Sequence, residues 1–114
     1  MNKERKHSFS EQELLDFKNN GFAGPFKLYE KEEMDAIWKK LRYTILDRSK
    51  AVYEMDNAVS SINNIGNYDR HLDVEFLKEH VAKAEIVDKL ADVLGNDIIC
   101  WRSEWFPKYP GSRK

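Results

Sequence analysis

The last stretch of the chain, residues 96–111, places charged side chains where a buried strand would carry apolar ones. It is the only run whose pattern predicts a strand. In the alternating geometry of a strand, Arg102 and Glu104 share one face with apolar neighbours, while Trp101 and Trp105 share the other. The indole face is expected to pack. The charged face either lies in water or lines a polar cavity, because buried charges must be paired or bound.

Four helices are predicted before this strand, over residues 11–20, 31–49, 74–81 and 84–94. Ser10 followed by Glu13 forms a capping box for the first helix, and Gly21 supplies its left-handed stop. Asp73 is expected to cap the third helix, and Gly95 ends the fourth. Apolar residues recur at helical spacing in the second and fourth segments. The predicted fold class is therefore mainly α with a C-terminal β-strand.

Composition restricts the class of protein. The 114 residues fit one domain, with residues 1–8 as a flexible tail and residues 9–114 as the domain. The net charge of −1 provides no field that would gather nucleic acid or anionic lipid. A lone cysteine, Cys100, fits a reducing cytosol and is expected to be an inert small hydrophobe. No apolar run approaches the ~20 residues of a membrane span, so a cytoplasmic protein without membrane or nucleic-acid partners is expected.

One motif suggests a metal site. His71-Leu72-Asp73 has the His-x-Asp spacing of an iron facial triad, and His80 is the remaining candidate ligand. Asp73 already has a predicted capping role, and His80 follows only a few residues later on a helix, which completes a triad poorly. Loop and capping roles are therefore favoured. No phosphate-binding loop, activated nucleophile or zinc cluster is evident, so no metal ligand or catalytic residue is predicted.

Several segments resemble the N-terminal part of the syringomycin-type chlorinating enzymes, which depend on iron(II) and 2-oxoglutarate and belong to the phytanoyl-CoA dioxygenase superfamily. They are Asn-Tyr-Asp-Arg-His-Leu-Asp at residues 67–73, Cys-Trp-Arg-Ser-Glu-Trp-Phe-Pro-Lys-Tyr-Pro-Gly at residues 100–111, and Asn-Gly-Phe-Ala-Gly-Pro-Phe at residues 20–26. The resemblance implies the N-terminal helical portion of a double-stranded β-helix (jelly-roll, cupin-like) oxygenase with the barrel largely missing. It also implies that Glu104 and Phe106, with Arg102 on the same face, line the cavity beside iron and substrate, while the tryptophans pack.

The resemblance further implies the chemistry of the complete enzyme. Such enzymes use iron(II), 2-oxoglutarate and chloride to halogenate an aminoacyl group tethered to a carrier protein in natural-product biosynthesis. Their first iron-binding His-x-small motif follows the equivalent of Gly111, so both iron histidines and the 2-oxoglutarate arginine are expected outside this sequence. The segment matching His71 is not a ligand in the family. We therefore expect this chain alone to bind neither iron nor 2-oxoglutarate productively, and to be inactive as a fragment.

Alternative readings follow from the same residues. The complete enzyme could be a hydroxylase of the same superfamily, since the discriminating residue beside the first iron histidine is not in this sequence. The chain could also be a truncated, non-catalytic interaction module, or one half of a split enzyme. An unpaired strand predicts self-association unless another strand or a helix covers it.

Overall fold

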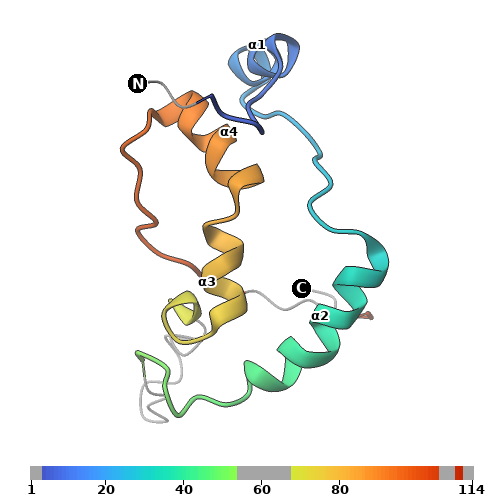
Figure 1. The fold of residues 1–114 in the computed structure, drawn as a ribbon, viewed down its shortest axis with the longest axis vertical. Helices are drawn as coiled ribbons and strands as arrows, with labels where there is room; N and C mark the ends of the chain where they lie inside the picture. The colour runs from blue at the N-terminus through green and yellow to red at the C-terminus, as the bar shows by residue number, and fades with distance from the viewer. Residues whose placement is uncertain (1–3, 54–67, 106–109, 112–114) are drawn as a thin grey trace.

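A computed structural model of the chain describes residues 4–53, 68–105 and 110–111. Its helices are α1 (Glu11–Asn20), α2 (Lys31–Thr44), the short 3-10 helix η3 (Arg70–Leu72), α3 (Glu75–Val81) and α4 (Ala84–Leu94) (Figure 1). The mainly helical part of the predicted fold class is therefore confirmed. No helix among these residues is both long and apolar enough to cross a membrane.

The helices form two groups, which are joined by a long connector between α1 and α2 and by a short one between α3 and α4. Figure 1 shows α1 beside α4 at one end and α2 beside α3 at the other. The radius of gyration is 17.0 Å, whereas a compact domain of this length has about 13 Å. The fold is therefore open, and it buries little apolar surface for its size.

The main core lies between α2 and α3. Leu41 and Ile45 from the end of α2 pack on Val74, and all three are less than a tenth exposed. Four partly buried side chains surround this cluster: Ile37, Phe76, Leu77 and Trp105. Trp105 connects the end of the chain to this core, because it comes from the segment predicted as a strand.

Helix α1 begins and ends as predicted. The Ser10 hydroxyl accepts a hydrogen bond from the Glu13 N–H at 3.1 Å, and Gly21 adopts a φ of 80° after the last turn. A left-handed residue at this position favours glycine, which has no Cβ to clash. Among the described residues, the reciprocal bond from the Glu13 carboxylate to Ser10 is not formed. The helix start is confirmed, with only the serine half of the capping box in place.

Replacing Ser10 with alanine should lower the free energy of unfolding by about 1 kcal/mol, because the Glu13 N–H loses its acceptor. Urea unfolding followed by far-UV circular dichroism measures this change. Ser10→Asp is the matched control, since a carboxylate caps equally well, and it should keep the parent stability. Equal stability of Ser10→Ala and the parent would show that this cap is not stabilising.

The N-terminal residues lie against α4. The Asp92 carboxylate accepts hydrogen bonds from the Phe9 N–H at 2.8 Å, the Arg5 guanidinium at 2.6 Å and the Ser8 hydroxyl at 3.1 Å. Burial raises the pKa of Asp92, but these donors outweigh it and hold the pKa below its usual value. Whether residues 1–8 are flexible stays a prediction.

Helix α2 ends at Thr44, and the predicted extension to residue 49 is wrong. The backbone turns more tightly after this point, with Leu46 N–H bonded to Tyr43 and Asp47 N–H bonded to Thr44. The Arg70 guanidinium donates hydrogen bonds to the carbonyl of Ile45 at 2.7 Å and to the carbonyl of Asp47 at 2.8 Å. A helix continued to residue 49 would need the Ile45 carbonyl for its own ladder.

The expected cap of α3 is also wrong. Helix α3 has Val74 at its N-cap position with no side-chain cap. The Asp73 carboxylate instead accepts from Arg70 Nε at 3.0 Å, and the ion pair is almost fully buried. Helix α4, by contrast, has the predicted bounds and ends at Gly95, which has a φ of 90°.

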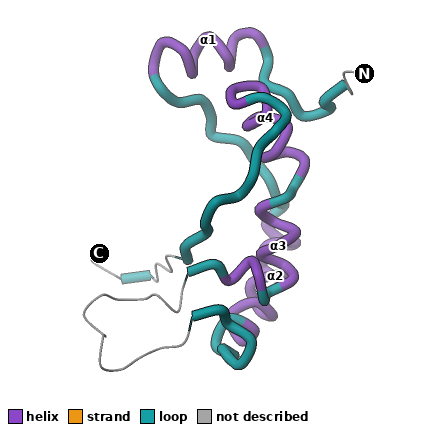
Figure 2. Tube along the Cα trace, turned by 90° about the vertical axis from the view of Figure 1, so that its left-hand side faces the viewer, coloured by secondary structure: helices purple, strands orange, loops and turns teal. Residues whose placement is uncertain are grey.

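The predicted C-terminal strand is not formed among the described residues. Residues 96–105, which we call the C-terminal segment, run past α4 and α3 as a loop (Figure 2). Their sole ladder contact within the described chain is an isolated antiparallel bridge between Tyr68 and Glu104. A strand requires a neighbouring backbone along its length, and the described residues supply one only at this point. No barrel is present in the described part of the chain.

Candidate functional site

Two loops that are far apart in sequence are joined by hydrogen bonds. The Asp69 N–H donates to the Ser103 carbonyl at 2.9 Å, and the Ser103 N–H donates to Asp69 Oδ1 at 3.1 Å. His71 Nδ1 lies 2.5 Å from the Ser103 hydroxyl. Asp69 itself has a φ of 55°, a left-handed conformation that aspartate tolerates better than most residues. This double clamp fixes the C-terminal segment against η3.

Arg70 holds the same loop to the end of α2. Its side chain is 1% exposed, and it is the largest fully buried side chain in the described chain. It donates to two backbone carbonyls of the α2 terminus and to the Asp73 carboxylate. A buried guanidinium is stable only when its donors are satisfied, and these acceptors satisfy them. The loop that positions the candidate site is therefore held by a charge network.

Two of the predicted cavity residues, Arg102 and Glu104, both contact Tyr68. Arg102 lies over the Tyr68 ring at 5.1 Å and 3.8 Å from Asp69 Oδ2, with 46% of its side chain exposed. Glu104 is exposed and forms the bridge to Tyr68. Phe106 lies outside the described residues. Their cavity-lining role stays a prediction.

Glu104 lies beside a cleft of about 380 Å³ between the C-terminal segment and α3. The cleft is lined by Arg70, Leu77, His80, Val81, Ser103, Glu104 and Trp105. It combines an apolar floor with a carboxylate, a hydroxyl and an imidazole, which suits a small polar ligand. Arg102 does not line this cleft.

The two tryptophans of the predicted packing face behave differently. Trp105 is half-buried and stacks on Trp38 of α2, with ring centroids 6.3 Å apart. Trp101 is 86% exposed, so the expectation that it packs is wrong within the described chain. Trp105 packs because it reaches the α2–α3 core, whereas the described residues offer Trp101 no neighbour of comparable size.

An aromatic cluster around His80 was not found by reading the sequence. The Tyr29 hydroxyl lies 2.8 Å from His80 Nδ1, although the two residues are 51 positions apart. The Phe76 ring lies 5.9 Å from the imidazole and 6.2 Å from the Tyr29 ring, so the three rings pack on one another. Only the Phe76–His80 pair was visible in advance, because residues four apart lie on one face of a helix. Burial, followed by the nearby Lys83 ammonium, lowers the pKa of His80 below its usual value.

The lowered pKa of His80 predicts an acid-sensitive stability. The unfolded chain binds a proton near pH 6.5, while the folded chain resists protonation to a lower pH. The contribution of neutral His80 to the free energy of unfolding is therefore fully present above this pH. It should be lost as the pH drops from about 6.5 toward the folded pKa. Urea midpoints between about pH 5 and pH 7.5 measure this slope. His80→Gln should flatten it, and an unchanged slope in that variant would contradict the assignment.

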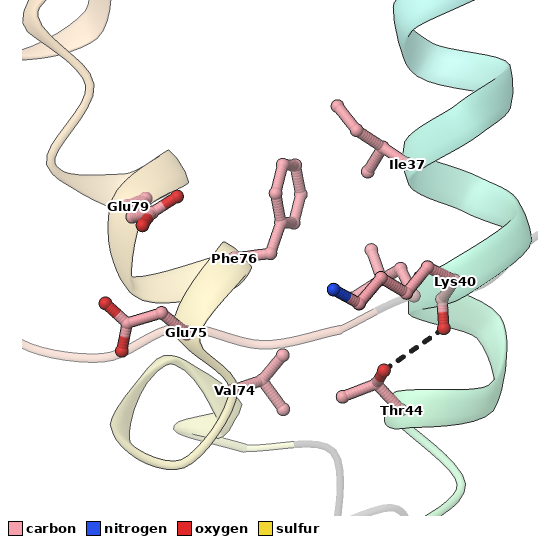
Figure 3. A pocket seen from close by; sticks show the side chains of 8 residues that line it. Ile37, Lys40, Thr44, Val74, Glu75, Phe76 and Glu79 are labelled. Carbon is pink, nitrogen blue, oxygen red and sulfur yellow. Dashed lines mark hydrogen bonds between the residues drawn. The ribbon is translucent and has the colours of Figure 1, made fainter.

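A second cleft lies between α2 and α3 and measures about 390 Å³ (Figure 3). Ile37, Val74 and Phe76 give it apolar walls, and Figure 3 shows them projecting between the two helices. Lys40 and Glu75 add opposite charges at its edges. Its lining residues include no histidine, cysteine or serine, so we assign it no catalytic role.

The described residues do not fit an iron site. His71 is bonded to Ser103, Asp73 to Arg70, and His80 to Tyr29. Within the described ranges, no group of three His, Cys, Asp or Glu side chains could hold a metal ion. The facial triad of His71, Asp73 and His80 is therefore not assembled in this structure.

Comparisons with known proteins agree with the resemblance in the sequence. The profile of the family described as phytanoyl-CoA dioxygenase (PhyH) matches residues 17–114. Two solved structures, CytC3 with Fe(II) and alpha-ketoglutarate and CytC3 alone, are 45% identical to this chain, with TM-scores of 0.78 and 0.79. Each match covers 90% of this chain but only 37% of CytC3. No curated protein matches.

Proposed function

We propose that this chain, which belongs to the phytanoyl-CoA dioxygenase family, forms the helical N-terminal portion of an iron(II)- and 2-oxoglutarate-dependent halogenase. One observation carries the proposal. Over 90% of its length the chain is 45% identical to CytC3, which has been solved with Fe(II) and alpha-ketoglutarate (2-oxoglutarate), and the TM-score is 0.78. Identity at this level over so long a stretch supports the inference that this chain has the same fold as the matched part of CytC3. It also supports the inference that the chain occupies the same position in its own enzyme.

The described residues define what this chain contributes. Because they form no metal site, we assign the iron and 2-oxoglutarate ligands to the part of the family fold that this chain does not cover. The chain then supplies the helical support and one wall of the cavity. Its C-terminal segment is held in place by the Asp69–Ser103 clamp and by Trp105.

Within this wall, Glu104, Arg102 and Phe106 are the proposed cavity-lining residues. Support comes from Glu104, which borders the 380 Å³ cleft. Its exposed carboxylate can accept charge-assisted hydrogen bonds, so it suits a substrate that presents an amine. Arg102 would hold the C-terminal segment in place through its contacts with Tyr68 and Asp69. An aminoacyl group carried as a thioester by a carrier protein is the proposed substrate.

A chimera tests the proposal. This chain replaces the part of CytC3 that it matches, and the product formed on a carrier-tethered amino acid with chloride present is analysed by mass spectrometry. The expected result is a product with the isotope pattern of chlorine. Glu104→Gln should reduce turnover by about tenfold or more, because a misplaced substrate reacts slowly. Glu79→Gln, on the α2–α3 cleft, is the matched control and should keep turnover.

Two outcomes would contradict the proposal. A product that carries a hydroxyl group in place of chlorine would show that this chain does not hold the substrate where the halogen is transferred, because the residue that discriminates the two reactions comes from the CytC3 part. A folded chimera that binds iron and 2-oxoglutarate as CytC3 does, but gives no product, would show that this chain does not supply the substrate wall.

A further inference from the structure

We infer that Asp69 is a positioning residue that sets the specificity of the candidate site for a substrate with a free amine. It acts through Arg102, whose guanidinium it holds beside Tyr68, so that the Glu104 carboxylate stays available to the substrate. The inference rests on the proposed function for the substrate, an aminoacyl group. The arrangement of the side chains comes from the structure alone.

Asp69 is a buried carboxylate at the junction of two loops. It is 7% exposed, and its two oxygens have different neighbours. Oδ1 accepts the Ser103 N–H at 3.1 Å, whereas Oδ2 lies 3.8 Å from Arg102 Nε. Ser103 comes immediately before Glu104 in the chain. One side chain therefore fixes the backbone next to Glu104 and also contacts the guanidinium on the other side of Ser103.

Arg102 has two carboxylates within reach. Glu104 is only two residues further along the chain, so the two Cα atoms are at most about 7 Å apart, and arginine pairs readily with a carboxylate. In the structure the guanidinium takes the other partner. It lies near Asp69 and 5.1 Å from the centre of the Tyr68 ring, and it does not line the 380 Å³ cleft. Asp69 and the aromatic face together hold it outside the cleft.

Glu104 keeps a carboxylate that no cation neutralises within residues 4–53, 68–105 and 110–111. The side chain is exposed and borders the cleft, and no ion pair or side-chain hydrogen bond uses it there. Such a carboxylate forms a charge-assisted hydrogen bond with a substrate ammonium group. If Arg102 paired with it instead, its charge would be neutralised and the site would lose its preference for a free amine.

Asp69→Asn tests the first step of the inference in the 114-residue chain. The backbone at this position has a φ of 55°, which asparagine adopts readily, and the amide oxygen can still accept the Ser103 N–H. Hydrogen exchange at the Ser103 amide should therefore keep the parent rate. The charge that attracts Arg102 is absent, so nuclear Overhauser effects between Arg102 and the Tyr68 ring should be lost.

The chimera with CytC3 measures the specificity. Its two substrates are an aminoacyl thioester on the carrier protein and the N-acetylated form of the same thioester, which carries no positive charge. Asp69→Asn should lower the preference for the free amine, measured as the ratio of the two kcat/KM values, by about tenfold. Adding Arg102→Met should restore most of this preference, because no guanidinium is left to pair with Glu104. Removal of a second side chain would not correct a purely structural defect.

Asp92→Asn is the matched control. The Asp92 carboxylate also accepts a backbone N–H and pairs with an arginine, Arg5, at 2.6 Å, but it belongs to α4 and does not line the cleft. This variant should keep the parent preference. Glu104→Gln should lower the preference, and combining it with Asp69→Asn should lower it no further, because both changes act through the same carboxylate.

Several results would overturn the inference. They are Arg102–Tyr68 Overhauser effects that persist in Asp69→Asn, a lowered preference that Arg102→Met does not restore, an equal loss in Asp92→Asn, or a parent chimera that does not prefer the free amine. A chimera that turns over neither substrate would contradict the proposed function instead. The Overhauser effects need neither iron nor turnover, so in that case they decide the inference by themselves.

Discussion

Replacing Arg70 with methionine should lower the free energy of unfolding by about 3–5 kcal/mol, because it leaves a buried charge without its partner. The Arg70 side chain is 1% exposed and the Asp73 side chain is 7% exposed, so water cannot replace the lost guanidinium. The carbonyls of Ile45 and Asp47 lose their donors as well. Since small domains have only about 5–15 kcal/mol in total, the variant should lose a large share of its stability.

Urea unfolding followed by circular dichroism measures this loss, with Arg102→Met as the matched control. Arg102 is also paired with an aspartate, but its side chain is 46% exposed and the ion pair measures 3.8 Å. Exposed pairs of this kind contribute at most about 1 kcal/mol. Adding Asp73→Leu to Arg70→Met should recover part of the stability, since it removes the unpaired carboxylate. Equal losses from the two arginine variants would contradict the assigned role of Arg70.

Trp105→Ala should destabilise the chain by about 3 kcal/mol, near the lower end for loss of a buried aromatic side chain. Trp105 packs on the cluster of Leu41, Ile45 and Val74 and stacks on Trp38. The variant loses apolar burial and an aromatic pair that adds about 0.5–1.5 kcal/mol of its own. The C-terminal segment should also loosen, because it loses its anchor in the α2–α3 core and keeps mainly its contacts with residues 68–71.

Trp101→Ala is the matched control, because the side chain is 86% exposed and surface changes are usually worth less than about 0.5 kcal/mol. Urea midpoints give the stabilities, and hydrogen exchange at the Asp69 and Ser103 amides reports on the clamp. Faster exchange in Trp105→Ala, with parent rates in Trp101→Ala, is expected. A larger loss of stability in Trp101→Ala than in Trp105→Ala would contradict the assignment of Trp105 as the packed indole.

Local signals were sufficient for most helix boundaries. The Ser10 cap, the Gly21 stop and the bounds of α4 depend on neighbouring residues and on a regular apolar spacing, which a single sequence contains. The resemblance to the chlorinating enzymes, carried by residues 67–73 and 100–111, correctly predicted the phytanoyl-CoA dioxygenase family.

Long-range contacts account for the failed predictions. The end of α2 and the role of Asp73 both depend on Arg70, which binds carbonyls 25 and 23 positions away. Neighbouring residues give no sign of this reach across the fold, so it was missed. The Tyr29–His80 contact joins residues with no common periodicity.

The C-terminal strand failed for a different reason. The alternation is present in the sequence, but burial does not follow it: Ile98 is partly buried, whereas Cys100 on the same predicted face is exposed. A strand also needs a neighbouring backbone along its length, and the partner decides whether a ladder forms. For the same reason the roles of Arg102 and Glu104 remain proposals that depend on the opposite side of the cavity.

We propose that this chain contributes the helical wall of an iron enzyme and not its metal site. Anaerobic titration with iron(II) and 2-oxoglutarate, followed through the visible charge-transfer band, tests it most directly. We predict no band from the 114-residue chain and a clear band when the chain replaces its matched part of CytC3. A clear band from the chain alone, or none from a folded chimera, would contradict the account.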